Sequence, residues 1–308
     1  MFKFNTALYA INFGEYFYEN IDCFINFAKL GLKEINFIHV VNINKLQHSL
    51  YSRYNKEDEE KIIEIAESKL KDIKKNLEKY DFEVKCKIRI GDIADEIVDE
   101  ANTENVDFIV LDKKTSGKTG TFFAFYGSPL YEILVKSNKP VLITKRNLIY
   151  YSNLIKNGKK DDLDCRNAFD DVLFATDFSN SSLKGVSFLN NVPLGIIKTL
   201  TLLTVLDEKT VNNLNKKGLN AFELKIAEKF GNIIQDLNID LQKKSNLETV
   251  IKKGVPYKEI NDFIVQTCKK LLVIGFKGRD SENIQEIFFG STAERIISAL
   301  PCSILIVK

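Results

Sequence analysis

The chain has 308 residues, 44% of them apolar and 28% charged, which is typical of soluble globular proteins with one large or two ordinary domains. Its 44 basic and 42 acidic residues leave a formal charge of +2, too small to favour nucleic acid or an anionic membrane as a general partner. Five scattered cysteines without a Cys-x-x-Cys pair argue against zinc or dithiol chemistry and suggest a reducing cytoplasm, and no apolar stretch approaches the roughly 18 residues of a membrane helix.

The first half of the chain alternates apolar strands with amphipathic helices. Strands are predicted, in chain order, over residues 6–14, 35–41, 85–91, 106–112 and 139–145. Helical spacing of apolar residues predicts helices over 17–28, 56–80 and 92–101. The loop before the last strand carries the segment GSPLYEIL. Because the strands are apolar throughout rather than at alternate positions, they are typical of a sheet that is covered on both faces.

The second half repeats this order about 165 residues later. DVLFATDFS (171–179) matches the first strand, LTLLTVL (200–206) the second, and KLLVIGF (270–276) the fourth. A long helix, a Gly-x-[AP] turn, the segment GSTAERII and a final strand, PCSILIVK, complete the copy. The sequence therefore predicts an α/β fold with two tandem doubly wound domains, each a five-stranded parallel sheet with helices on both faces. We expect domains at 1–146 and 170–308, joined by a polar linker at 147–169.

A possible P-loop follows the fourth strand of the first half. Gly117, Lys118 and Thr119 match the last three letters of the Walker A motif, whose backbone N–H groups and lysine bind phosphates. Asp112 occupies the position of the motif's first glycine, and the loop follows the fourth strand rather than the first. A P-loop NTPase is therefore a remote alternative.

The second half offers a different interpretation of this loop. There the fourth strand is followed by Gly275, Gly278 and a Gly290-Ser291 pair, and the first half has Gly117 followed by a Gly127-Ser128 pair. Glycine permits close backbone approach to a ligand, and a Gly-Ser pair that opens a helix offers N–H and hydroxyl donors to phosphate. Either pair alone could be an ordinary helix cap. Its occurrence twice, at the edge where parallel sheets bind ligands, favours a phosphate site.

These residues resemble the universal stress protein family, whose loop pattern is G-x-x-G, nine residues, then G-[ST]. The resemblance implies ATP or AMP binding in one branch of the family and nucleotide-free signalling or assembly in another. It implies that the Asp after the first strand lies near ribose and phosphates, that the end of the second strand lines the adenine pocket, and that the loop holds phosphate. The residues so implied are Asp177, Val205, Gly275, Gly278, Gly290 and Ser291 in the second half and Val41, Gly117, Gly127 and Ser128 in the first.

Both halves depart from the family pattern. In the first half, Asn12 replaces the Asp, Gly14 replaces the Ser, and Lys114 stands where the first loop glycine belongs. In the second half, eleven residues rather than nine precede Gly290. A loop absorbs two residues at small entropic cost, so the second half is the better match, although Lys118 makes the first loop electrostatically favourable for phosphate.

We therefore expect a cytoplasmic, regulatory stress-response protein that binds ATP or AMP, with or without Mg²⁺. The alternative is a nucleotide-free signalling or structural module of the same fold. Neither nucleic acid nor a membrane is an expected partner, and a homo-oligomer and further protein partners stay open. No general base is evident, since His39 at the end of the second strand is better explained by packing, so any ATP hydrolysis should be slow and incidental.

Overall fold

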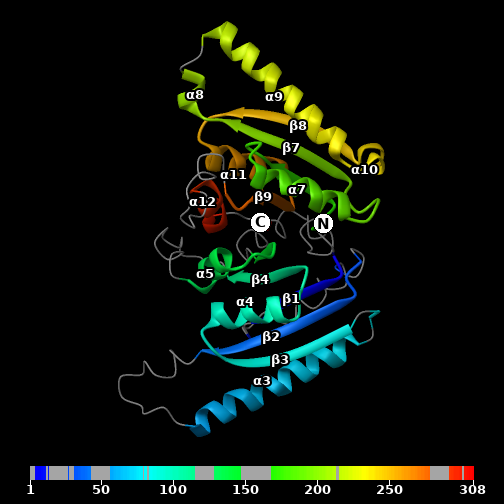
Figure 1. Ribbon diagram of the computed structural model, residues 1–308, viewed down its shortest axis with the longest axis vertical. Coiled ribbons are helices and arrows are strands. Elements are labelled where there is room, and N and C mark those ends of the chain that lie inside the picture. The colour runs from blue at the N-terminus through cyan, green and yellow to red at the C-terminus, as the bar shows by residue number, and fades with distance from the viewer. Residues whose placement is uncertain are drawn as a thin grey trace, which may run out of the picture. The chain divides into compact units, whose positions relative to one another are not determined.

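A computed structural model of the chain describes residues 4–11, 13, 27, 31–42, 56–78, 80–81, 83–114, 128–146, 168–212, 215–277, 291–299 and 302–308 (Figure 1). The chain divides into two compact units that correspond broadly to its two halves. Most of the predicted helix at 17–28 and most of the proposed linker at 147–169 lie outside the described residues. None of the described helices is both long and apolar enough to cross a bilayer.

The first unit contains a five-stranded sheet in the order β3-β2-β1-β4-β5. Its strands pair in parallel from β3 through β2 and β1 to β4. Its elements are β1 (Thr6–Ala10), β2 (Glu34–Asn42), α3 (Lys56–Leu77), β3 (Glu83–Gly91), α4 (Ile93–Thr103), β4 (Phe108–Lys114), α5 (Pro129–Lys136) and β5 (Val141–Arg146).

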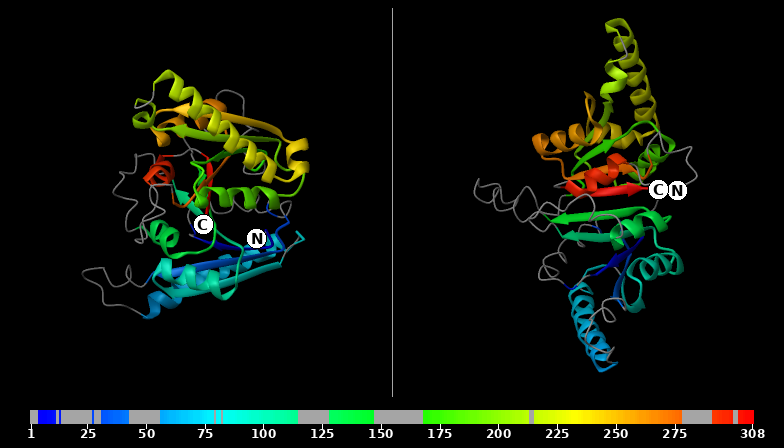
Figure 2. Two further views of the ribbon diagram at one scale, coloured as in Figure 1. Left: turned by 45° about the horizontal axis from the view of Figure 1, so that its top comes forward. Right: turned by 90° about the vertical axis from the view of Figure 1, so that its left-hand side faces the viewer.

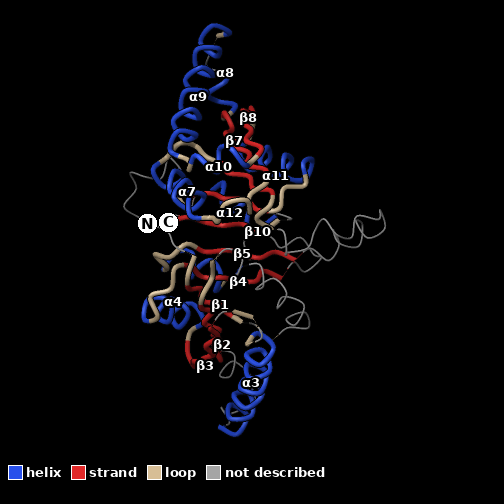
Figure 3. Tube along the Cα trace, turned by 90° about the vertical axis from the view of Figure 1, so that its right-hand side faces the viewer, coloured by secondary structure: helices blue, strands red, loops and turns tan. Residues whose placement is uncertain are grey.

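Helices cover both faces of this sheet. Neighbouring residues of a strand point to opposite faces, and on β3 the thiol of Cys86 lies 3.6 Å from the Leu70 carbonyl oxygen of α3, while Lys87 bonds to Glu100 of α4. Helices α3 and α4 therefore pack on opposite faces, as Figure 3 shows. The buried face of α3 carries Leu70, Ile73 and Leu77 at helical spacing.

A buried carboxylate ties α4 to β3. The Glu100 side chain is only 3% exposed and accepts hydrogen bonds from Lys87 at 2.8 Å and from Arg89 at 2.7 Å. Burial alone would raise the pKa of Glu100, but the hydrogen bonds from Lys87 and Arg89 outweigh it and the pKa is lowered.

In the second unit, Phe263 lies under Lys252, whose Nζ is 5.8 Å from the ring centroid. The same strand-to-helix contact is thus ionic in one unit and aromatic in the other.

The second unit contains the sheet order β8-β7-β6-β9-β10, and all of these neighbours pair in parallel. Its elements are β6 (Asp171–Ala175), α7 (Asn180–Asn191), β7 (Thr199–Leu206), α8 (Glu208–Asn212), α9 (Lys216–Asp236), α10 (Ile239–Lys244), β8 (Asn246–Lys253), α11 (Pro256–Thr267), β9 (Leu271–Gly275), α12 (Ser291–Ala299) and β10 (Ser303–Val307). Helices α7 and α9 contact each other, and α11 contacts α12 and the strands β7 and β8. Figure 2 gives two further views of these elements.

Both units place a glycine between the third strand of the sheet and the following helix. A Cβ atom on Gly91 would lie 2.6 Å from Oε1 of Glu96, and one on Gly254 would lie 2.7 Å from Oε1 of Glu259. Gly254 also has a φ of 147°. Glycine at these two positions thus leaves room for a glutamate side chain of the following helix. The predicted fold class, two tandem doubly wound α/β domains, is confirmed.

Candidate functional site

The order of strands in the second unit makes the carboxyl end of its sheet a candidate ligand site. From β6 the chain moves outward to β7 and β8, then returns to place β9 on the other side of β6. In open parallel sheets, ligands bind outside the carboxyl ends of the strands at such a point of reversal. The segments that follow β6 and β9 are therefore the relevant ones.

The turn after β6 is fixed by its own side chains. The backbone N–H of Phe178 donates to Thr176 Oγ1 at 2.9 Å, and the N–H of Ser179 donates to Asp177 Oδ1 at 3.1 Å. Ser179 then caps α7, because its Oγ accepts from the Ser182 N–H at 3.2 Å. Asp177 is thereby held between the carboxyl end of β6 and the amino end of α7.

The loop after β9 packs directly on this turn. A Cβ atom on Gly275 would lie 2.7 Å from the backbone nitrogen of Ser182, so only glycine fits there without a shift of α7. The N–H of Lys277 donates to Ser181 Oγ at 3.1 Å, and Ser179 Oγ donates to the Lys277 carbonyl at 3.5 Å. Two segments almost 100 residues apart in sequence are thus joined by hydrogen bonds at the reversal point.

The other predicted residues of the second half have different placements. Val205 is half-buried near the end of β7, the strand beside β6. Ser291 is exposed and is the first residue of α12. Gly278 and Gly290 lie outside the described residues. The described geometry therefore brings Asp177 and Gly275 together at the carboxyl ends of β6 and β9, with Val205 near the end of the adjoining strand β7.

The carboxyl end of the first unit's sheet corresponds to this region. The residues that correspond between the two units differ from those that the sequence suggested. The N–H of Ile11 donates to the Ile38 carbonyl at 2.8 Å, as that of Thr176 donates to Leu203 at 2.9 Å. Two residues after Ile38 lies Val40, and two after Leu203 lies Val205. Hence Val40, which is half-buried like Val205, is the equivalent residue, whereas Val41 is buried with 4% exposure.

The register also corrects the position assigned to the first loop glycine. The matching strand pairs are Tyr9 with Val110 and Phe174 with Val273. Asp112 lies two residues after Val110, and Gly275 lies two residues after Val273. Asp112 rather than Lys114 therefore occupies the position of Gly275. Strand β4 continues to Lys114, whereas β9 ends at Gly275. Asp112 accepts a hydrogen bond from the Tyr9 hydroxyl, so a carboxylate lies where the second unit has a glycine.

The remaining predicted residues of the first half are accounted for as follows. Ser128 caps α5, since its Oγ accepts from the Tyr131 N–H at 3.2 Å. Gly117, Lys118 and Gly127 lie outside the described residues. The described part of the first Gly-Ser pair thus serves as a helix cap.

His39 is held by packing and a backbone hydrogen bond. Its Nδ1–H donates to the Ile11 carbonyl at 3.0 Å, and its ring lies 4.6 Å from the Phe13 ring between centroids. Burial lowers the pKa of His39, a shift that the Ile11 hydrogen bond opposes and Lys69 reinforces. A neutral, hydrogen-bonded imidazole in this position has a structural role.

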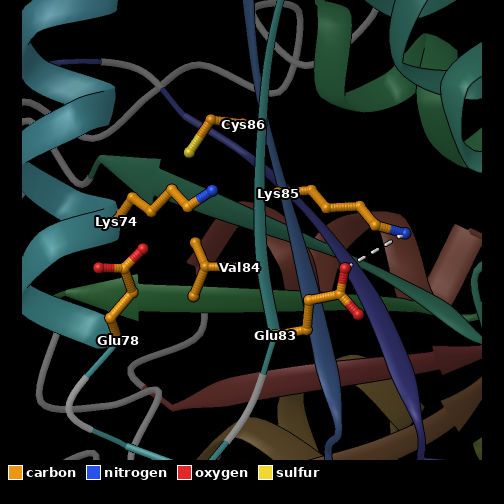
Figure 4. Close-up of a pocket in the computed structure, with 6 residues that line it drawn as sticks. All are labelled: Lys74, Glu78, Glu83, Val84, Lys85 and Cys86. Carbon is orange, nitrogen blue, oxygen red and sulfur yellow. Dashed lines mark ion pairs between the residues drawn. The ribbon is translucent and has the colours of Figure 1, made fainter.

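A separate hollow of about 520 Å³ lies at the outer edge of the first unit (Figure 4). It is lined by Lys74, Glu78, Glu83, Val84, Lys85 and Cys86. It adjoins the amino-terminal part of β3, the end opposite to that where parallel sheets bind ligands. Burial raises the pKa of the Cys86 thiol to about 11, against the effect of Lys74, and a protonated thiol is a poor nucleophile.

Within the part of the chain that the structure describes, no cluster of three or more His, Cys, Asp and Glu side chains is arranged to hold a metal ion. The described residues at the carboxyl end of the second unit's sheet offer backbone N–H groups, hydroxyls and the Asp177 carboxylate. Such donors and acceptors are suited to polar ligands and anions.

Comparison with known proteins gives consistent matches in both halves. The model of the universal stress protein family matches residues 6–145 and 168–308. Universal stress protein MJ0577 of Methanocaldococcus jannaschii is 32% identical over 134 residues, which are 39% of this chain and 82% of that protein. MJ0531 of the same organism is 27% identical over 168 residues, 52% of this chain and 92% of that protein.

The fold also matches solved structures over its full length. The crystal structure of a universal stress protein from Archaeoglobus fulgidus has a TM-score of 0.66 and 19% identity, and the match covers 99% of this chain and 97% of that chain. At this identity the match shows the fold alone, including the tandem arrangement of two α/β units.

Proposed function

The chain belongs to the universal stress protein family, and we propose that its second unit binds an adenine nucleotide, ATP or AMP, as a regulatory module of the stress response. The observation that carries this proposal is the direct packing of the Asp177 turn against the Gly275 loop at the reversal point of the sheet. Both segments match the family's nucleotide-binding pattern.

Each proposed contact follows from the chemistry of its residue. Asp177 is a carboxylate acceptor suited to ribose hydroxyls, and Val205 supplies an apolar edge for adenine. Gly275 lets the two segments approach closely. Gly278, Gly290 and Ser291 are the proposed phosphate contacts, with the amino end of α12 as an electrostatically favourable anion site. Mg²⁺ would enter with ATP through the phosphate oxygens.

We assign nucleotide binding to the second unit rather than the first because of Asp112. A carboxylate at the Gly275 position adds negative charge beside the region where phosphate would lie, and it also adds side-chain volume. Asn12 further replaces the acidic residue of the family pattern. The first unit is accordingly proposed as a nucleotide-free module with a structural or signalling role.

The proposed role of the site is binding rather than fast catalysis. The side chains described at the carboxyl end of the second unit's sheet include Asp177 and three serines, and those serine hydroxyls have hydrogen-bond partners in the turn or on Lys277. We propose binding with at most slow, incidental hydrolysis, in a cytoplasmic protein with domains at 1–146 and 170–308.

The proposal is tested by analysing what the purified protein carries. Denaturation followed by chromatography should release ATP or AMP, and added nucleotide should raise the melting temperature of the stripped protein, because a ligand that binds only the folded state stabilises it. Absence of both effects, with and without Mg²⁺, would contradict the proposal.

A further inference from the structure

Phe178 has an unusual backbone conformation within the candidate site. Its φ is 62°, in the left-handed region that a bulky side chain rarely adopts. It lies between Asp177 and Ser179, whose side chain and backbone form the turn before α7. Such a conformation persists only where surrounding contacts hold it, and it is often found where a site requires a fixed geometry.

Two residues of the long helix α9 hold the Phe178 ring. The ring centroid lies 5.3 Å from that of Phe230 in an edge-to-face arrangement, and 5.1 Å from Nζ of Lys229. Phe230 is buried with 2% exposure, whereas Lys229 is exposed. The aromatic contact and the cation–π contact are both attractive in this geometry. We call Phe178, Lys229 and Phe230 the Phe178 clamp.

We propose that the Phe178 clamp positions the Asp177 turn for nucleotide, so that Lys229 and Phe230 of α9 are positioning residues of the site; this rests on the proposed function. The clamp fixes the residue between Asp177 and Ser179, and Ser179 in turn bonds to the Gly275 loop through Lys277. If the clamp favours the binding-competent turn, nucleotide must reciprocally stabilise the clamp.

The first unit provides a matched control. There Lys69 of α3 lies 5.1 Å from the centroid of Phe13, which occupies the position of Phe178. Leu70 follows Lys69 where Phe230 follows Lys229. The two lysines thus make the same contact in two units, of which only the second is proposed to bind nucleotide. Any general effect of the lost lysine on folding should therefore occur in both.

The experiment compares full-length wild type with Lys229→Ala, Lys69→Ala and Lys229→Arg. Affinity for ATP and AMP is measured by calorimetry, and melting temperature is measured without nucleotide. We expect Lys229→Ala to weaken binding by about three- to tenfold, the effect of losing one cation–π contact. Lys69→Ala should leave affinity unchanged with a similar shift in melting temperature, and Lys229→Arg should retain near wild-type affinity.

Hydrogen exchange tests the reciprocal effect. Bound nucleotide should slow amide exchange around Lys229 and Phe230, while exchange around Lys69 and Leu70 stays the same. If wild type binds nucleotide and Lys229→Ala binds equally well, or if both alanine variants lose affinity alike, the positioning role of the Phe178 clamp is contradicted and the proposed function stands. If wild type binds neither ATP nor AMP, both are overturned.

Discussion

The backbone nitrogen of Ser182 lies so close to Gly275 that a Cβ atom there would be 2.7 Å away. Ser182 belongs to the first turn of α7, and Gly275 is the last residue of β9. A clash with backbone cannot be relieved by rotating a side chain, so a larger residue must move α7 or the end of β9. This contact sets the distance between the two segments of the candidate nucleotide site.

Substitution of Gly275 should therefore affect both stability and binding. We expect Gly275→Ala to lower the free energy of unfolding by about 1–3 kcal/mol, the usual cost of overpacking, and to weaken nucleotide affinity. Gly231→Ala on α9 is the control, since a Cβ there meets nothing within 4 Å, and it should stabilise by up to about 1 kcal/mol through helix propensity. Urea unfolding of both variants measures the difference. Equal behaviour of the two would mean that Gly275 is not closely packed.

The buried Glu100 predicts a pH-dependent stability difference. We expect Glu100→Gln to lower the free energy of unfolding by about 1–2 kcal/mol at pH 7, because Lys87 and Arg89 lose a charged acceptor. The pKa of Glu100 is lowered by folding, so its stabilisation is present above the ordinary pKa of 4.5 and is lost as the pH falls through the lower folded value.

Wild type and Glu100→Gln should accordingly converge in stability as the pH falls below about 4.5. Denaturant unfolding between pH 7 and pH 3 measures this. Glu60→Gln, which removes an exposed ion pair with Lys56, serves as control and should change stability by less than about 0.5 kcal/mol throughout. A gap for Glu100→Gln of the same size at pH 3 as at pH 7 would show that the carboxylate's charge is not the source of its stabilisation.

Lys118 distinguishes the proposed site from a P-loop. If the second unit binds nucleotide, Lys118→Ala should change ATP affinity by less than about twofold, because the lysine follows the fourth strand of the first half, which is proposed not to bind nucleotide. In a P-loop the lysine contacts the β- and γ-phosphates directly, and its loss would remove most of the affinity. Equilibrium titration of ATP with wild type and variant gives the answer.

The sequence was sufficient to predict the architecture because the signal for it is local and occurs twice. Apolar strands such as residues 171–175 and amphipathic helices such as α3 carry their own periodicity, and the 165-residue repeat removes most alternatives. Asp177 and Gly275 could likewise be placed near each other, because the carboxyl ends of parallel strands lie on the same side of a sheet.

The sequence could not fix details that depend on where a strand stops. Spacing counted back from Gly117 selected Lys114 as the missing glycine, but β4 runs two residues longer than β9, and the register selects Asp112. For the same reason the sequence pointed to Val41, whereas the register makes Val40 the equivalent of Val205. The Phe178 clamp also had no sequence signal, since Lys229 lies about 50 residues from Phe178 and meets it only in the folded unit.

Calorimetric titration of ATP and AMP into stripped wild type, Gly290→Asp and Gly127→Asp tests whether the second unit binds adenine nucleotide. The two variants add the same carboxylate to the corresponding loop of each half. We predict that wild type and Gly127→Asp bind nucleotide with equal affinity and that Gly290→Asp does not bind. Loss of binding in Gly127→Asp alone, or unchanged affinity in both variants, would contradict the assignment.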